Sequence, residues 1–121
     1  MKLYIIRHGQ TDWNVEGKIQ GRQDIPLNDM GRRQARALAD GMKSRPVASV
    51  YSSPQKRAME TAEAIAGPLG LTVKAVPQLM EIGYGDWEGR SAEDILTTDR
   101  ELYESWWQHP ATVAPPGGET L

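Results

Sequence analysis

Three short apolar runs, separated by stretches with helical patterning, constrain the fold of this chain most strongly. The runs cover residues 3–6, 47–51 and 71–76. The first is uninterruptedly apolar and rich in isoleucine and tyrosine, which is typical of a buried strand. Strand, helix, strand, helix and strand with short connections are typical of an α/β protein with a parallel sheet. We therefore expect a sheet of parallel strands with helices packed against it.

Helices are expected between the runs. The first should be capped by Asn28 or Asp29 and run to about Lys43. The second should start at Ser53 as cap, with Pro54 at the first helical position. The expected packing faces are Ala35, Leu38, Ala39 and Met42 in the first helix, and Ala58, Ala62, Ile65 and Ala66 in the second.

The C-terminal third begins with a loop rich in glycine and aromatic residues, "LMEIGYGDWEGRS". Gly67 and Pro68 are expected to end the second helix, and residues 92–108 are expected to form one further helix. Its bulky side chains available for burial are Leu96, Tyr103, Trp106 and Trp107.

Length and composition limit what the chain can do. The 121 residues predict a single domain, 1–121, with one modest core. The balance of 14 basic and 16 acidic residues favours neither nucleic acid nor an anionic membrane as a partner. Cysteine is absent, which excludes disulfides and thiolate chemistry. The apolar run before Arg7 is only four residues long, too short for a signal peptide or a membrane span, so a cytoplasmic location is expected.

Reactive side chains follow each of the three expected strands. Arg7 and His8 follow the first, Arg57 lies in the first turn of the helix after the second, and Glu81 lies in the loop after the third. In open α/β sheets, ligands bind beyond the carboxyl ends of the strands. We therefore expect these four side chains to gather at one edge of the sheet.

Two arginines beside a helix N-terminus form a suitable site for a doubly charged tetrahedral anion, and phosphate is the obvious occupant. Asn14, Gln20 and the backbone of Gly21 lie in the loop after the first strand and could add neutral hydrogen-bond donors. The sequence therefore predicts a phosphate-binding pocket.

His8 is a candidate nucleophile in such a pocket. Neighbouring guanidinium charges disfavour the imidazolium, so a neutral ring could attack phosphorus and form a phosphohistidine. Gly9 would allow the backbone to turn there. Glu81 could protonate the departing alkoxide and later activate water. This scheme requires no cofactor and no metal, and the sequence has no dense cluster of Asp, Glu and His residues.

Each of these residues also has a purely structural interpretation. His8 could be a surface or structural histidine, Arg57 with Lys56 a solvated helix face, and Glu81 one carboxylate among many. The run around Trp87 would ordinarily be a turn with a packed tryptophan, and Trp106 and Trp107 are expected to pack rather than to form a stacking platform. The joint placement of the reactive residues after successive strands favours the catalytic interpretation.

An ordered series of motifs resembles one family along essentially the whole chain. The series is "RHGQTDWN", "QGRQDIPLNDMGRRQA", "VYSSPQKRAMETA", "EIGYGDWEGRS" and "PPGGET". It is similar to the histidine phosphatase superfamily, also called phosphoglycerate mutase-like. The resemblance implies a three-layer α/β sandwich around a mostly parallel sheet.

The resemblance also implies roles for individual residues. His8 would be the phosphorylated nucleophile, Arg7 and Arg57 the phosphoryl clamp, and Glu81 the proton donor. Asn14, Gln20 and Gly21 would line the phosphate pocket, and residues 116–120 would border the substrate.

The segment after Glu81 resembles the phosphatase branch, which includes broad-specificity and α-ribazole phosphatases, more than the glycolytic mutases. The expected function is hydrolysis of a small phosphomonoester. Phosphoglycerate mutase activity and a phosphate-binding module with impaired catalysis stay open as alternatives.

One feature of the family has no counterpart in this chain. Members carry a second catalytic histidine in an "SHG"-like context after a late strand, which normally lies beside the first strand. His109, in "WWQHPAT", does not match it. We therefore expect these residues to be the N-terminal portion of a longer enzyme, or a second or swapped copy to complete the sheet.

Overall fold

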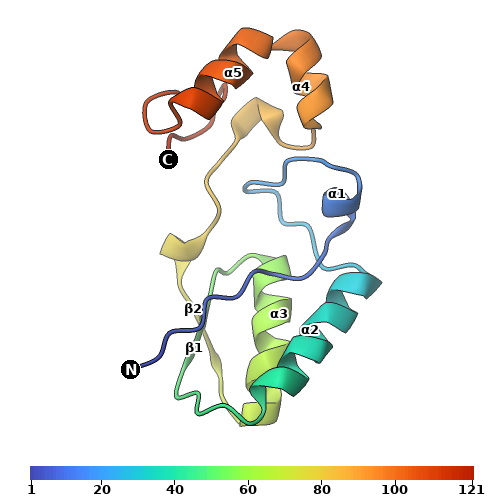
Figure 1. The fold of residues 1–121 in the computed structure, drawn as a ribbon, viewed down its shortest axis with the longest axis vertical. Helices are drawn as coiled ribbons and strands as arrows, with labels where there is room; N and C mark the ends of the chain where they lie inside the picture. Colours follow the sequence, from blue (N-terminus) through green and yellow to red (C-terminus); the bar gives the residue numbers. More distant parts are fainter. The chain divides into compact units, whose positions relative to one another are not determined.

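The computed structural model describes all residues from 1 to 121. The chain divides into two compact units: residues 1–11 with 26–79, and residues 12–25 with 80–121. Figure 1 traces the elements of both units along the chain. No helix in either unit is long and apolar enough to span a membrane.

A two-stranded parallel sheet lies in the first unit. Strand β1, Val50–Ser52, pairs with β2, Val73–Ala75, and Tyr51 is in register with Lys74. The α/β class with a parallel sheet is therefore confirmed, although both strands are shorter than the apolar runs predicted. Helix α3 connects the two strands and contacts both of them, as Figure 1 shows.

Helix α2, Asp29–Met42, begins and ends close to the predicted positions. The open choice of cap is settled by the Asn28 side chain, whose Oδ1 accepts the Gly31 N–H at 2.9 Å. Ala39 and Met42 are buried against Ile65 of α3, and Leu38 is half-buried beside them. The helical periodicity of the sequence therefore gave the correct packing face.

Helix α3, Lys56–Ala66, starts later than predicted. Ser53 is not its cap, because Gln55 is the N-cap residue and still has extended backbone angles. The Ser53 hydroxyl instead accepts the Gln55 N–H at 3.3 Å, a local turn that competes with helix initiation. The predicted end is correct, since a short 3-10 helix, η1, Gly67–Leu69, follows directly. A second 3-10 helix, η2, Pro77–Leu79, follows β2.

The prediction of a buried strand over residues 3–6 is wrong. No strand is assigned there, and Leu3 and Ile5 are 78% and 89% exposed. Tyr4 alone packs against the cluster of Ala39, Met42 and Ile65. A strand whose side chains are apolar on both faces is buried only when other elements cover both faces. In this unit α3 packs against both strands and α2 packs against α3.

The second unit is built around aromatic side chains. Trp87 and Ile95 are fully buried, and Trp106 is 8% exposed. The Trp87 and Trp106 ring centroids lie 5.8 Å apart in an edge-to-face arrangement. The packing interpretation is therefore confirmed for Trp87 and Trp106, whereas Trp107 is 64% exposed.

The single helix predicted over 92–108 is two helices, α4, Ala92–Thr98, and α5, Arg100–Gln108. The break falls at Asp99, whose carboxylate accepts hydrogen bonds from the Trp87 indole at 3.2 Å and from Arg90 at 3.4 Å. The hydroxyl of Thr97 also bonds back to a backbone carbonyl of α4. The backbone of Asp99 has non-helical angles, φ −132° and ψ 36°, and this bend separates the two helices.

Two short helices lie in the loops of the second unit. Helix α1, Asp12–Val15, is a single turn within the stretch predicted as a loop between residues 9 and 26. The 3-10 helix η3, Gly85–Trp87, lies in the glycine- and aromatic-rich loop. Both are too short to have been distinguished from loop by sequence periodicity.

Candidate active site

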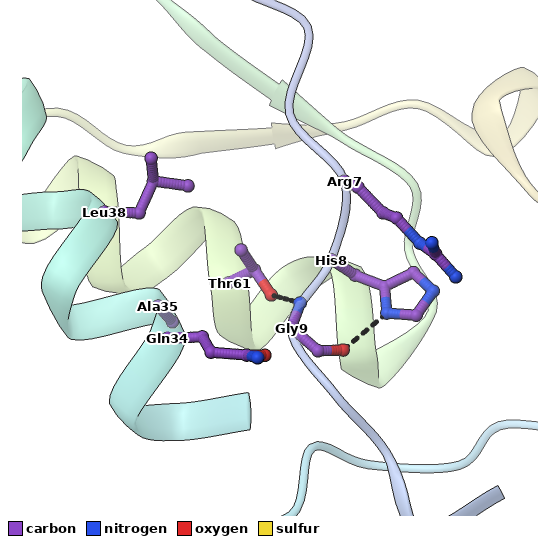
Figure 2. A pocket seen from close by; sticks show the side chains of 7 residues that line it. All are labelled: Arg7, His8, Gly9, Gln34, Ala35, Leu38 and Thr61. Atoms are coloured by element: carbon purple, nitrogen blue, oxygen red, sulfur yellow. Dashed lines mark hydrogen bonds between the residues drawn. The ribbon is translucent and has the colours of Figure 1, made fainter. Parts of the chain in front are cut away.

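The Arg7–His8–Gly9 segment crosses α2 and α3 in the first unit. It lines a hollow of about 200 Å³ whose other walls come from those two helices: Gln34, Ala35, Leu38 and Thr61. Figure 2 shows the Arg7 guanidinium and the His8 ring projecting from the segment on the side away from Leu38 and Gln34. The Arg7 and His8 side chains therefore point away from Leu38 and Gln34 of α2.

The His8 ring is held by its own chain. Its Nδ1 lies 2.6 Å from the carbonyl oxygen of Gly9, drawn as a dashed line in Figure 2. A carbonyl oxygen only accepts hydrogen bonds, so this contact requires the proton on Nδ1. In a neutral ring Nε2 then carries the lone pair, which is the form that a nucleophilic histidine needs.

Two glycines allow the Arg7–His8–Gly9 segment to lie directly on α2. A Cβ at Gly9 would come within 2.5 Å of the Gly31 carbonyl oxygen, and a Cβ at Gly31 within 2.1 Å of the Gln10 carbonyl oxygen. The contact is extended by the Asn28 N–H, which donates to the Gln10 carbonyl at 3.0 Å. Gly9 thus permits a close backbone approach rather than a sharp turn, since its φ is not positive.

Arg57 is only 3% exposed, so its interpretation as part of a solvated helix face is wrong. It lies in the first turn of α3, whereas its neighbour Lys56 is exposed. Buried arginines are found where their charge has partners. The Arg57 carbonyl oxygen accepts a 2.8 Å hydrogen bond from Thr61, whose hydroxyl also accepts the Gly9 N–H at 3.0 Å. The Thr61 hydroxyl therefore links the backbone of Arg57 to the backbone of Gly9, next to His8.

The remaining predicted site residues belong to the second unit. Asn14 lies in α1 and is half-buried, whereas Gln20 and Gly21 are buried. Gly21 has a φ of +52° in a crowded position, because a Cβ there would come within 2.3 Å of the Glu88 carboxylate. A glycine is therefore required at position 21.

Glu88 fixes the loops on both sides of Gly21. One of its carboxylate oxygens accepts the backbone N–H groups of Arg22 and Tyr84, at 2.9 and 3.0 Å. The other accepts from the Gln23 side chain at 3.0 Å. Glu88 thus binds the predicted pocket loop to the loop that contains Glu81.

Glu81 is exposed, and its Oε1 accepts the N–H of Ile82 at 2.9 Å. Burial of the Tyr84 phenol, together with the nearby negative charge of Glu81, raises the pKa of Tyr84 above its usual value. Tyr84 therefore keeps its proton and is a neutral neighbour to the predicted proton donor.

Residues 116–120, predicted to border the substrate, are tied to the Glu81 loop. The Glu119 carboxylate accepts the Gly83 N–H at 2.5 Å and lies 3.1 Å from the Arg22 guanidinium. These two donors lower the pKa of Glu119 below its usual value. Glu119 is therefore ionised near neutral pH and anchors this segment.

Neither unit holds three or more His, Asp or Glu side chains in an arrangement that could bind a metal ion. His109 is exposed at the C-terminal end of α5, where its N–H donates to the Ser105 carbonyl. It closes a helix in the second unit.

Sequence reasoning missed two residues that organise these loops. Thr61 lies four positions after Arg57, so the helical spacing placed both on one face and was the available signal. Glu88 follows Trp87 in a run interpreted as a turn, and nothing in that interpretation distinguished its carboxylate from others.

Comparison with known proteins identifies the family. The profile of the histidine phosphatase superfamily (branch 1) matches residues 3–121. The chain therefore belongs to the histidine phosphatase superfamily, as the ordered motifs indicated.

Curated relatives extend well beyond the region they share with this chain. Phosphoglycerate mutase-like protein 4 of Arabidopsis thaliana is 40% identical over 99% of the chain and 54% of its own length. Phosphoserine phosphatase 1 of Hydrogenobacter thermophilus is 35% identical over 100% of the chain and 57% of its own length. The chain thus spans little more than half the length of these relatives.

Solved structures show the same relationship in three dimensions. A mycobacterial glucosyl-3-phosphoglycerate phosphatase in complex with VO3 superposes with a TM-score of 0.86 at 37% identity, covering 93% of this chain and 54% of that one. The α-ribazole phosphatase of Shigella flexneri has a TM-score of 0.85 at 34% identity, over 95% and 57%. The fold is phosphoglycerate mutase-like, and the small sheet seen here is part of that fold.

Proposed function

We propose that this chain carries the phosphoryl-transfer residues of a phosphatase that hydrolyses small phosphomonoesters through phosphohistidine on His8. The observation that carries the proposal is the 2.6 Å contact between His8 Nδ1 and the Gly9 carbonyl, which leaves Nε2 as the nucleophilic nitrogen. The family and the phosphatase relatives support the same reaction class. The domain assignment 1–121 and the cytoplasmic location stay predictions.

In the first step, the Nε2 lone pair attacks phosphorus and the bond between phosphorus and the ester oxygen breaks. The electron pair of that bond leaves with the alkoxide, which Glu81 protonates from its carboxylic acid form. Arg7 and Arg57 neutralise the charge on the transferring phosphoryl group, and Asn14, Gln20 and Gly21 donate hydrogen bonds to it.

In the second step, the Glu81 carboxylate takes a proton from water as that water attacks phosphorus. The bond between phosphorus and Nε2 breaks, inorganic phosphate leaves, and the His8 ring regains its lone pair. The steps balance without any redox partner. The chain's own residues perform all of the proton transfers in this scheme.

The substrate class is a phosphomonoester of a small alcohol. The relatives' names include phosphoserine, glucosyl-3-phosphoglycerate and α-ribazole phosphatases, which share the phosphoester and differ in the alcohol. The residues proposed to bind the substrate contact the phosphoryl group, which the phosphoesters of all three relatives contain. Mutase activity is the second candidate, favoured by the mutase-like name of the Arabidopsis relative.

The proposal is tested by measuring phosphate release and phosphoryl transfer in the same reactions. Phosphoserine, 3-phosphoglycerate and an aryl phosphate serve as substrates, with His8→Ala as the inactive variant and His109→Ala as its matched control. We expect phosphate release that His8→Ala abolishes and His109→Ala preserves. Transfer between hydroxyls in excess of hydrolysis would indicate a mutase, and phosphate binding without turnover would indicate a binding module.

A further inference from the structure

The hydroxyl of Thr61 joins the two parts of the candidate site that belong to the first unit. Thr61 is 4% exposed, and its hydroxyl accepts the Gly9 N–H at 3.0 Å. The same hydroxyl donates to the Arg57 carbonyl at 2.8 Å. One side chain thus contacts the backbone of the arginine that is proposed to bind phosphate and the backbone next to the proposed nucleophile.

Within helices a threonine hydroxyl often donates to the carbonyl four residues earlier, and such a bond by itself shows only that the hydroxyl has a hydrogen-bond partner in its own helix. The second bond of Thr61 is different, because Gly9 lies 52 positions away in the sequence. That bond connects the helix to the catalytic segment. A local structural role therefore does not account for both hydrogen bonds.

The bond to Gly9 fixes the peptide group between His8 and Gly9. The next peptide group, between Gly9 and Gln10, is held by the Gln34 side chain, which accepts the Gln10 N–H at 2.9 Å. The carbonyl of that second peptide group is the one that receives His8 Nδ1 at 2.6 Å. Figure 2 shows Thr61 and the His8 ring bonded to Gly9 from its two sides. The orientation and tautomer of the ring thus depend on a backbone that Thr61 holds.

We propose that Thr61 is a positioning residue. It holds His8 in its nucleophilic tautomer and keeps the backbone next to His8 at a fixed position relative to the backbone of Arg57. The inference rests on the proposed function, in which His8 is phosphorylated. One hydroxyl oxygen both accepts from Gly9 and donates to Arg57, and serine is the substitution that keeps this hydroxyl at the same place on the side chain. Valine has nearly the shape of threonine and retains neither.

The test compares Thr61→Val with Thr61→Ser in the full chain. The tautomer of each histidine is measured by nitrogen NMR of the imidazole rings, with His109 as an internal control ring. The rate of phosphohistidine formation on His8 is measured separately. We expect Thr61→Val to shift His8 away from the Nδ1–H tautomer and to slow phosphorylation by about a hundredfold, as expected for a misplaced reacting group. Thr61→Ser should retain the tautomer and a rate within about threefold of the parent.

Equal His8 tautomers in Thr61→Val and the parent would overturn the proposal, and so would equal losses in the valine and serine variants. Should Thr61→Val fail to fold, amide hydrogen exchange of Gly9 in the parent chain still decides, because a bound N–H should exchange about a hundredfold more slowly than an unstructured one. An unprotected Gly9 amide would contradict the proposal. A parent chain that forms no phosphohistidine would instead refute the proposed function, since the tautomer measurement requires no phosphoryl transfer.

Discussion

Residues 56 and 57 illustrate how strongly adjacent side chains can differ in environment. Lys56 is exposed at the start of α3, whereas Arg57 is 3% exposed. Sequence alone left both the solvated and the anion-binding interpretations of Arg57 open. Burial excludes the first, and the planar guanidinium with its forked donors is of the kind that the proposed anion site needs.

We predict that Arg57→Lys weakens phosphate binding by about tenfold, because lysine retains the charge but loses the paired donors of the guanidinium. Calorimetric titration with orthovanadate or phosphate measures this change. Arg33→Lys, at an exposed position in α2, is the matched control and should leave the affinity within about twofold. Unchanged affinity in Arg57→Lys would show that Arg57 does not bind the anion.

The candidate site residues could be proposed from the sequence, and the reason is chemical. His8, the two arginines and Glu81 are conspicuous because their residue types follow successive apolar runs. Thr61 and Glu88 act through hydrogen bonds to backbone groups far away in the sequence, Gly9 for Thr61 and Arg22 for Glu88. Bonds of this kind leave no periodic pattern, so the sequence could not indicate them.

Helix α2 supports the Arg7–His8–Gly9 segment through its first turn. The Asn28 cap orients that turn, and Gly31 lets the backbone of Gln10 lie directly on it. A glycine within a helix ordinarily costs stability relative to alanine. Its presence at position 31 is explained by this close backbone contact.

We predict opposite effects for two glycine substitutions in this helix. Gly31→Ala should destabilise the chain by about 1–2 kcal/mol, because the clash with the Gln10 carbonyl outweighs the gain in helix propensity. Gly41→Ala places its Cβ in open space and should stabilise it by about 0.5–1 kcal/mol. Urea unfolding measures both. Stabilisation by Gly31→Ala would contradict the close contact.

The elements that sequence reasoning misplaced share a physical cause. The start of α3 follows a local turn held by the Ser53 hydroxyl, and the break between α4 and α5 falls at the non-helical backbone of Asp99, whose side chain accepts from Trp87. Hydrophobic periodicity is insensitive to such bonds, whereas it placed the buried face of α2 correctly.

At the scale of the whole molecule, the fold class was predictable but the burial of the first apolar run was not. Residues 3–6 have the composition of a core strand, yet Leu3 and Ile5 are exposed here. Tyr51 and Lys74, on the paired strands, are exposed as well, with the Lys74 ammonium 5.2 Å from the Tyr51 ring. An apolar composition indicates that a segment needs other elements packed over it to be buried. Which elements pack over residues 3–6 can be seen only in the three-dimensional structure.

The pH dependence of stability offers a further prediction at this scale. The pKa of Glu119 is lowered by the Gly83 N–H and by Arg22, so its stabilising effect is present above the ordinary value of 4.5 and is lost as pH falls through the lower, folded value. Glu119→Gln should therefore lose less stability than the parent between neutral pH and acid.

Unfolding by urea at a series of pH values measures this difference. Glu63→Gln, at an exposed position in α3 of the other unit, is the control and should follow the profile of the parent. Identical acid profiles for Glu119→Gln and the parent would show that the Glu119 anchor does not contribute to folding.

The central claim is that His8 carries the phosphoryl group during turnover. Rapid mixing of the chain with a phosphomonoester, quenching in alkali and mass spectrometry of the peptides tests it most directly. The account predicts one acid-labile, alkali-stable phosphoryl group on His8, absent in His8→Ala and retained in His109→Ala. A phosphoryl adduct that persists in His8→Ala, or phosphate release with no adduct on His8, would contradict it.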